Sequence, residues 1–116
     1  MVTVSHKRSN AVFRAIADPT RRRILGLLRD RRHSVGELAA NFRTSRPAIS
    51  KHLRLLRFAG LVTTKKEGTA RICGLNAKPL RSVGTWLLDY EALWSESLRG
   101  LKNYIEETDT RKEKSS

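Results

Sequence analysis

The chain has 116 residues, enough for one modest hydrophobic core, and no apolar run in it is long enough to span a bilayer. Its single cysteine excludes an intrachain disulfide, and its start lacks the apolar core of a secretory signal, so we expect a soluble cytoplasmic protein. The formal net charge of +13 lies in residues 1–71, which hold 17 Lys and Arg against 4 Asp and Glu, while residues 72–116 hold 7 of each kind. Such a field favours a polyanionic partner, most commonly nucleic acid, although an anionic membrane or an acidic protein would also be attracted.

The N-terminal part of the chain predicts a flexible arm and two helices. Residues 1–8 are basic and are expected to form a loose arm ahead of a folded domain over residues 9–107. A short amphipathic helix should end at Asp18-Pro19, where Asp18 can cap a second helix that runs to about residue 28 or 29. Three arginines, Arg21–Arg23, open this second helix; they would form either a solvated face or a contact with phosphates.

Two further helices carry clear capping signals. Ser34-Val35-Gly36-Glu37 fits a capping box at the start of a third helix, and apolar residues follow at helical spacing. Ser45 is expected to cap a fourth helix over residues 45–59, and Gly60 follows it at the position where a left-handed residue is favoured.

The fourth helix separates a basic face from an apolar face. A helical wheel places Arg46, Ser50, Arg54 and Arg57 within an arc of about 80°. The other side holds Ile49, His52, Leu53, Leu55 and Leu56. Because a helix fits the major groove and arginine can bond guanine through two donors, we expect this face to read DNA.

The N-terminal residues of this helix should contribute most to specificity, because that end meets base edges in helix-turn-helix docking. We therefore assign base contacts to Ser45, Arg46 and Ser50, and contacts with phosphate or solvent to Arg57. Lys51 and Arg54 complete the basic set. His52 is either a structural histidine near the turn or a secondary DNA contact.

A β-hairpin is predicted over residues 61–75, with a turn at Glu67-Gly68-Thr69. Lys65, Lys66 and Arg71 flank its tip, where they would form a solvated face or reach phosphate and the neighbouring minor groove. Cys73 in the second strand is either a small apolar filler or a sensor of oxidants.

A long last helix is expected over about residues 77–107, followed by a disordered tail at 108–116. About 30 helical residues span about 45 Å, which is too long for one small domain to cover. The apolar residues that repeat along it at spacings of three and four are Leu80, Val83, Leu87, Tyr90, Trp94, Leu101 and Tyr104. A two-fold partner would cover this face in a homodimer; the alternative is a helix folded back over its own domain.

Two short capped helices followed by a basic hairpin predict a winged helix-turn-helix: mainly α, with a small β-hairpin and a long C-terminal dimerisation helix. The segments that carry a more specific likeness are ADPTRRRIL at 17–25, SVGELA at 34–39, AISKHLRLL at 48–56 and AGLV at 59–62. Together they resemble the ArsR/SmtB family of winged-helix repressors over roughly residues 10–105. The resemblance implies a homodimeric bacterial or archaeal transcriptional regulator, usually a repressor that binds an inverted repeat in double-stranded DNA.

The same resemblance argues against metal sensing. Many relatives bind metal through a Cys-x-Cys pair before the recognition helix, but the matching positions here are Ser34 and Gly36. Others use carboxylates and histidines on the last helix, and here Asp89 and the nearby glutamates have no histidine after His52 to join them. We expect no metal and no cofactor, and no effector can be named.

Three other classes of function place different requirements on the sequence. The sequence lacks a recognisable catalytic array, a Gly-rich phosphate loop and a plausible carboxylate pair, so an enzyme is not expected. A sequence-indifferent architectural nucleic-acid binder would need only the positive charge. A winged helix that binds protein would show weak DNA affinity with little salt dependence.

Overall fold

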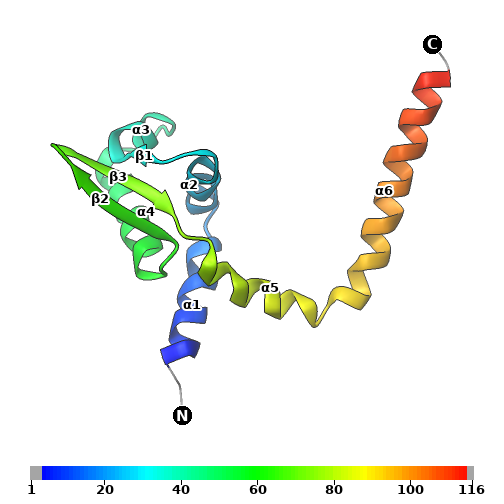
Figure 1. Ribbon diagram of the computed structural model, residues 1–116, viewed down its shortest axis with the longest axis horizontal. Coiled ribbons are helices and arrows are strands. Elements are labelled where there is room, and N and C mark those ends of the chain that lie inside the picture. The colour runs from blue at the N-terminus through cyan, green and yellow to red at the C-terminus, as the bar shows by residue number, and fades with distance from the viewer. Residues whose placement is uncertain (1–3, 115–116) are drawn as a thin grey trace. The chain divides into compact units, whose positions relative to one another are not determined.

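The computed structural model describes the backbone of residues 4–114 and the side chains of residues 9–97 and 99–108. The elements, in chain order, are α1 (Val4–Ile16), α2 (Pro19–Asp30), β1 (His33–Ser34), α3 (Val35–Ala40), α4 (Arg46–Phe58), β2 (Val62–Glu67), β3 (Ala70–Leu75), η1 (Lys78–Leu80), α5 (Arg81–Leu88) and α6 (Glu91–Lys114) (Figure 1). The chain divides into two units, one ending at Val83 and the other beginning at Gly84.

Side-chain caps begin three of the helices, as the sequence predicts. Asp18 caps α2 and Ser45 caps α4, each by accepting a hydrogen bond from a backbone N–H of the first turn. At α3 the Ser34 hydroxyl accepts from the Glu37 N–H, and the Glu37 carboxylate accepts from the Ser34 N–H. This reciprocal pair confirms the predicted capping box.

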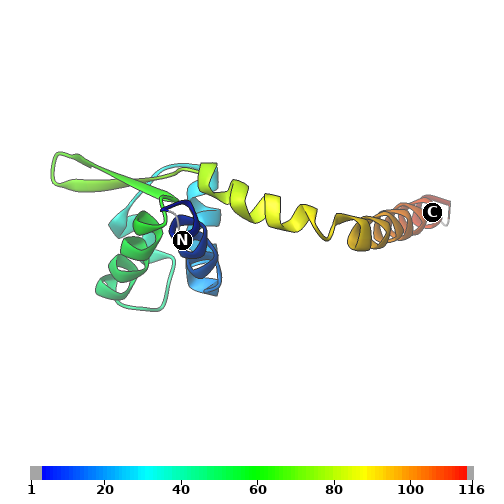
Figure 2. The same cartoon turned by 90° about the horizontal axis from the view of Figure 1, so that it is seen from below.

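The core of the first unit lies between helices α1 to α4 and one face of the sheet (Figures 1 and 2). Its buried residues are Val12, Ala15, Ile24, Leu28, Leu38, Ile49, Leu53, Leu56, Ala59, Leu61, Val62 and Cys73. Leu80 and Val83 pack against it from the segment after the sheet. On α4 the helical spacing selects three of these core residues, Ile49, Leu53 and Leu56.

The sheet has three antiparallel strands in the order β1-β3-β2, one more than the sequence predicts. The predicted hairpin is confirmed: β2 and β3 pair from Val62 with Leu75 to Glu67 with Ala70, and they project beyond the helices as a wing (Figure 2). Gly68 opens the two-residue turn with φ of +60°, a conformation that glycine adopts without steric cost. The additional strand, β1, is only two residues long and pairs His33 with Cys73.

The predicted long C-terminal helix is interrupted. A 3₁₀ turn and α5 come first, and α6 begins only at Glu91. The N–H groups of Asp89 and Tyr90 bond to carbonyls three residues earlier, which tightens the last turn of α5 and ends it. Aspartate favours this kind of end because its side chain competes with the helical backbone.

The two ends also differ from the sequence expectation. Helix α1 begins at Val4, so the backbone of residues 4–8 is helical rather than a loose arm, and residues 1–3 lie outside the described residues. Helix α6 continues to Lys114, which leaves only residues 115 and 116 of the expected tail undescribed. The fold class is confirmed: the first unit is a winged helix-turn-helix, and a long C-terminal helix follows.

Candidate nucleic-acid interface

Helix α4 is fixed at both ends. Pro47 occupies its first turn after the Ser45 cap. At the other end Gly60 has φ of +78°; its N–H bonds to the Arg57 carbonyl at 2.9 Å, and the next N–H bonds to the Leu56 carbonyl at 3.0 Å. These two bonds form a Schellman motif, which stops the helix where the sequence predicts.

One side of α4 packs and the other side is basic, as the helical wheel predicts. Ile49, Leu53 and Leu56 are buried. The exposed basic residues of the helix are Arg46, Lys51, Arg54 and Arg57, and Ser50 beside them is half-buried. Leu55 departs from the expectation: it is 40% exposed, because it lies at the edge of the packed arc next to Phe58, which is 81% exposed.

The side chain of Arg46 lies against the first turn of α3. Its guanidinium atoms are 3.8 to 3.9 Å from the point where a Cβ would stand on Gly36. The predicted base reader thus rests over a residue with no side chain and stays exposed to solvent. A long side chain can leave such a surface at little cost when a partner approaches.

The wing carries basic residues on both of its faces. Opposed residues of an antiparallel pair share a face and successive residues alternate, so the buried Val62 and Cys73 define the core face. Lys66 and Arg71 are opposite each other on that side, beyond the core. Lys65, which is opposite Ile72, lies on the outer face, directed away from the helices.

Arg57 connects α4 to the wing. Its Nη1 is 3.4 Å from the Thr64 hydroxyl oxygen, and Thr64 lies on the same face as Lys66. The structure therefore brings Arg57, Lys66 and Arg71 to one side of the first unit. It separates Lys65 from them, although the sequence had grouped all three wing cations.

His52 occupies a structural position between helices. Its Nδ1 lies 3.3 Å from Arg21 Nη1 and 3.9 Å from Asp18 Oδ2. The backbone N–H of Arg21, helped by the charges of Arg21 and His52, holds the pKa of Asp18 below its ordinary value. These contacts favour the structural interpretation of His52 over the DNA contact.

The three arginines at the start of α2 have partners within the protein, which neither sequence interpretation predicts. Arg21 donates to the carbonyls of Arg14 and Ala15, and Arg22 donates to the carbonyl of Ile16 at 2.8 Å. These carbonyls end α1, where cations are favoured by the helix dipole. Arg23 lies over the Phe42 ring, 4.7 Å from its centroid.

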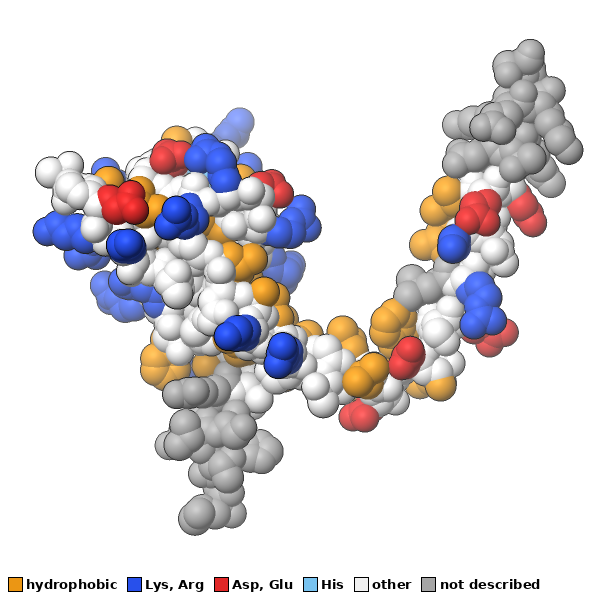
Figure 3. All heavy atoms as spheres, viewed as in Figure 1, with side chains coloured by type: hydrophobic (Ala, Val, Ile, Leu, Met, Phe, Trp, Pro, Cys, Tyr) orange, Lys and Arg blue, Asp and Glu red, His pale blue; other side chains and the backbone are white. Residues whose placement is uncertain are grey.

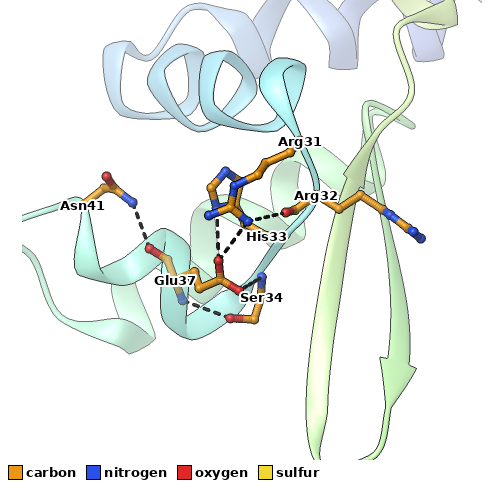
Figure 4. A network of polar contacts seen from close by, with 6 residues as sticks. All are labelled: Arg31, Arg32, His33, Ser34, Glu37 and Asn41. Carbon is orange, nitrogen blue, oxygen red and sulfur yellow. Dashed lines mark hydrogen bonds and ion pairs between the residues drawn. The ribbon is translucent and has the colours of Figure 1, made fainter.

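A polar network joins β1 to α3 (Figure 4). The Glu37 carboxylate accepts from the Ser34 N–H, and its Oε2 lies 3.1 Å from Arg31 Nη1 and 3.6 Å from the buried His33 Nδ1. The Ser34 N–H, and after it the Arg31 side chain, hold the pKa of Glu37 below its ordinary value. The next residue, Arg32, points away from this network and across the strands (Figure 4).

Sequence reasoning gave no role to Arg31 or Arg32. The available signal was their position: the two cations lie three and two residues before Ser34, the first residue of the capping box. Basic side chains are spread over the face of the first unit that Figure 3 shows, around the wing and the sheet.

Cys73 is fully buried at the centre of the sheet, and burial raises the pKa of its thiol. A buried, protonated thiol behaves as a small apolar side chain. The structure therefore favours the interpretation of Cys73 as a small apolar residue of the core over that of a sensor of oxidants.

Residues of the expected dimer face fall into two groups. Leu80 and Val83 are partly buried against the core of their own unit. The other five are exposed in the described chain, on α5, α6 and the turn between them: Leu87, Tyr90, Trp94, Leu101 and Tyr104. The rings of Trp86 and Tyr90 contact each other in a tilted arrangement, with 5.2 Å between their centroids and 57° between their planes.

Among the described side chains, no three His, Cys, Asp or Glu residues gather closely enough to hold a metal ion. No helix of residues 4–114 is long and apolar enough to cross a membrane.

Comparisons with known proteins identify the family. Residues 18–64 match the family model described as bacterial regulatory protein, arsR family. The transcriptional repressor SdpR of Bacillus subtilis is 38% identical over 81 residues, which cover 70% of this chain and 90% of that protein. The HTH-type transcriptional regulator Rv2034 of Mycobacterium tuberculosis is 34% identical over 102 residues, 88% of this chain and 92% of that protein.

A solved structure indicates the same family as these two relatives. The crystal structure of the ArsR family transcriptional regulator RHA00566 superposes with a TM-score of 0.71 at 36% identity, and the match covers 82% of this chain and 97% of that one. These relatives are regulators of transcription rather than enzymes. The chain therefore belongs to the ArsR family of winged helix-turn-helix transcriptional regulators.

Proposed function

We propose that the protein is a sequence-specific, homodimeric repressor of transcription that binds an inverted repeat in double-stranded DNA through α4 and the wing. The observation that carries this proposal is the exposed basic side of α4 opposite a buried apolar side, at the recognition position of a helix-turn-helix. The relationship to a transcriptional repressor of 38% identity supports it.

In this proposal the N-terminal end of α4 contacts bases, and the rest of α4 and the wing contact phosphates. Ser45, Arg46 and Ser50 contact base edges, with Arg46 reading guanine. Lys51, Arg54 and Arg57 on α4, and the wing cations, contact phosphates and position the helix. His52 acts indirectly, by joining α4 to the start of α2.

Two copies are needed to read an inverted repeat, because each winged helix-turn-helix places a single recognition helix in the groove. The exposed apolar side chains of α5 and α6 would supply the contact between copies (Figure 3). The proposed repressor acts in the cytoplasm, where bacterial and archaeal DNA lies, and requires no metal or cofactor.

The test is selection of bound fragments from random DNA, followed by competition against bulk DNA. We expect a palindromic motif and a preference for it of about a thousandfold or more. Arg46→Ala should erode that preference, whereas Lys66→Ala should weaken binding to all sequences alike. Arg99→Ala, which removes the same charge from α6, is the matched control and should change neither.

The net charge of +13 favours one competing function, an architectural binder that does not read sequence. Such a protein would yield no motif in the selection, and Arg46→Ala and Lys66→Ala would then have equal effects on every duplex.

A further inference from the structure

The outer face of the wing holds a second basic surface, which is separate from the basic side of α4. Lys65 lies there, and its register partner Ile72 is only partly buried and does not join the core. Thr63 and Gly74 form the neighbouring pair on the same face. This face is directed away from α4, so its cations lie apart from the basic side of that helix.

Arg32 adds a cation to this outer face. Its Cγ and Cδ atoms lie 3.5 Å from the point where a Cβ would stand on Gly74, so its aliphatic stem rests on the bare backbone of β3. Figure 4 shows the side chain extended across the strands. Arg32 and Lys65 are both exposed, and each therefore presents its charge to solvent from the outer face.

Charge on the core side of the wing is arranged separately. Lys66 and Arg71 are opposed near the tip, and both are exposed. Glu67 is the acidic residue of the hairpin and, by alternation, lies with Lys65 on the outer face, next to the turn. Because the Glu67 carboxylate repels phosphate near the turn, we expect a phosphate on the outer face to bind nearer the base of the wing, where Arg32 lies.

We propose that the outer-face pair, Arg32 and Lys65, binds the sugar-phosphate strand opposite to the one contacted by Lys66 and Arg71, so that the wing stands between the two strands of the duplex. This inference rests on the proposed function. The argument is electrostatic: a wing lying flat on one strand needs cations on one face, whereas a wing between two phosphate rows gains from cations on both.

The first experiment measures the salt dependence of DNA binding, with the full chain and any duplex that it binds. Arg32→Ala and Lys65→Ala should each lower the slope of log affinity against log salt by about one, because each contact releases about one counterion. Arg32→Lys should restore most of the slope. Arg99→Ala serves again as the control for net charge, and an unchanged slope in Arg32→Ala, with its thermal melt intact, would overturn the proposal.

The second experiment distinguishes the strands. Neutral methylphosphonates replace the phosphates under the wing on one strand at a time of a selected duplex. Neutralising one strand should abolish the effect of Arg32→Ala and leave that of Lys66→Ala, and neutralising the other should do the reverse. If both substitutions respond to the same strand, the inference fails while the proposed function stands.

A third variant moves Arg32 without removing its charge. In Gly74→Val the Cβ would stand 3.5 Å from the Arg32 stem and 3.3 Å from Thr63 Oγ1, and we expect the two methyl groups beyond it to displace Arg32 from the sheet. The salt slope should then fall as in Arg32→Ala, with the thermal melt showing how far the sheet tolerates the change. If the protein selects no DNA motif, the proposed function fails, and the first experiment still decides the role of Arg32 on unselected DNA.

Discussion

At the scale of single residues, several side chains that the sequence offered as DNA contacts hold the protein together instead. Arg21 is the clearest case: it bonds two carbonyls at the end of α1 and contacts His52 of α4. A hydrogen bond from a charged donor contributes about 1.5–3 kcal/mol when its partner is shielded from water. Arg21 therefore links α1, α2 and α4, and it is not free to meet phosphate.

Asp18 provides a residue-scale prediction. Asp18→Ala should lower the free energy of unfolding by about 1 kcal/mol at neutral pH, because α2 loses its cap. Asp18→Asn keeps an oxygen acceptor and is the matched control, with a smaller loss. Chemical denaturation monitored by circular dichroism measures both.

The pH dependence of this effect follows from the lowered pKa of Asp18. A carboxylate whose folded pKa lies below its unfolded value stabilises the fold above the unfolded pKa and loses this effect as the pH falls through the folded pKa. The difference between wild type and Asp18→Asn should therefore shrink in acid, below about pH 4. Parallel stability curves from pH 7 to pH 3 would contradict the assignment.

At the scale of elements, the sequence predicted the helix ends that depend only on residues a few positions away. The beginnings of α2, α3 and α4 are set by Asp18, Ser34 and Ser45, each of which caps through hydrogen bonds a few residues away. The end of α4 at Gly60 is equally local. Such signals lie in one short stretch of sequence and need no knowledge of the tertiary fold.

Features that depend on distant partners were not predicted. Strand β1 is two residues, His33–Ser34, too short to show a period, and it exists because β3 offers an unpaired edge. Arg32 is at the wing because Gly74 leaves room for it, and that requires the register of the sheet. The interruption after α5 contains neither proline nor glycine, so the apolar repeat runs through it unbroken.

Substitutions of two glycines test how a helix end and a helix interior contribute to stability. Gly60→Ala should destabilise the protein by about 1–2 kcal/mol, because an L residue is strained at φ of +78° and its Cβ would meet Pro79 at 3.4 Å. Gly26 in α2 has open space around it, so Gly26→Ala should instead stabilise by about 0.5–1 kcal/mol. Equal shifts of the two melting temperatures would contradict this account.

At the scale of the whole molecule, the second unit consists of the end of α5 and α6, and none of its described side chains is buried. Trp94, Leu101 and Ile105 are spaced by seven and four residues, so they share one face of α6, and all three are exposed in the described structure. An isolated helix with an exposed apolar face is marginal in water. We propose that a second copy of the same face covers it.

The matching experiment uses two leucines of α6. Leu101→Lys places a charge on the shared face and should convert the dimer to a monomer in sedimentation equilibrium, with a large loss of operator affinity. Leu93→Lys introduces the same charge at a residue that is 77% exposed and lies about 100° around the helix from Trp94, and it should leave the dimer intact. Dimers that persist in Leu101→Lys would rule out this face as the interface.

Ser34 belongs to two elements at once, since it is the last residue of β1 and the cap of α3. No loop separates β1 from α3 there. The wing strand β3 is therefore connected to α4 by a continuous series of contacts: β3 pairs with β1, β1 leads directly into α3, and α3 packs against α4. We therefore expect the spacing between recognition helix and wing to be set when the chain folds, and the duplex to bend or twist to fit it.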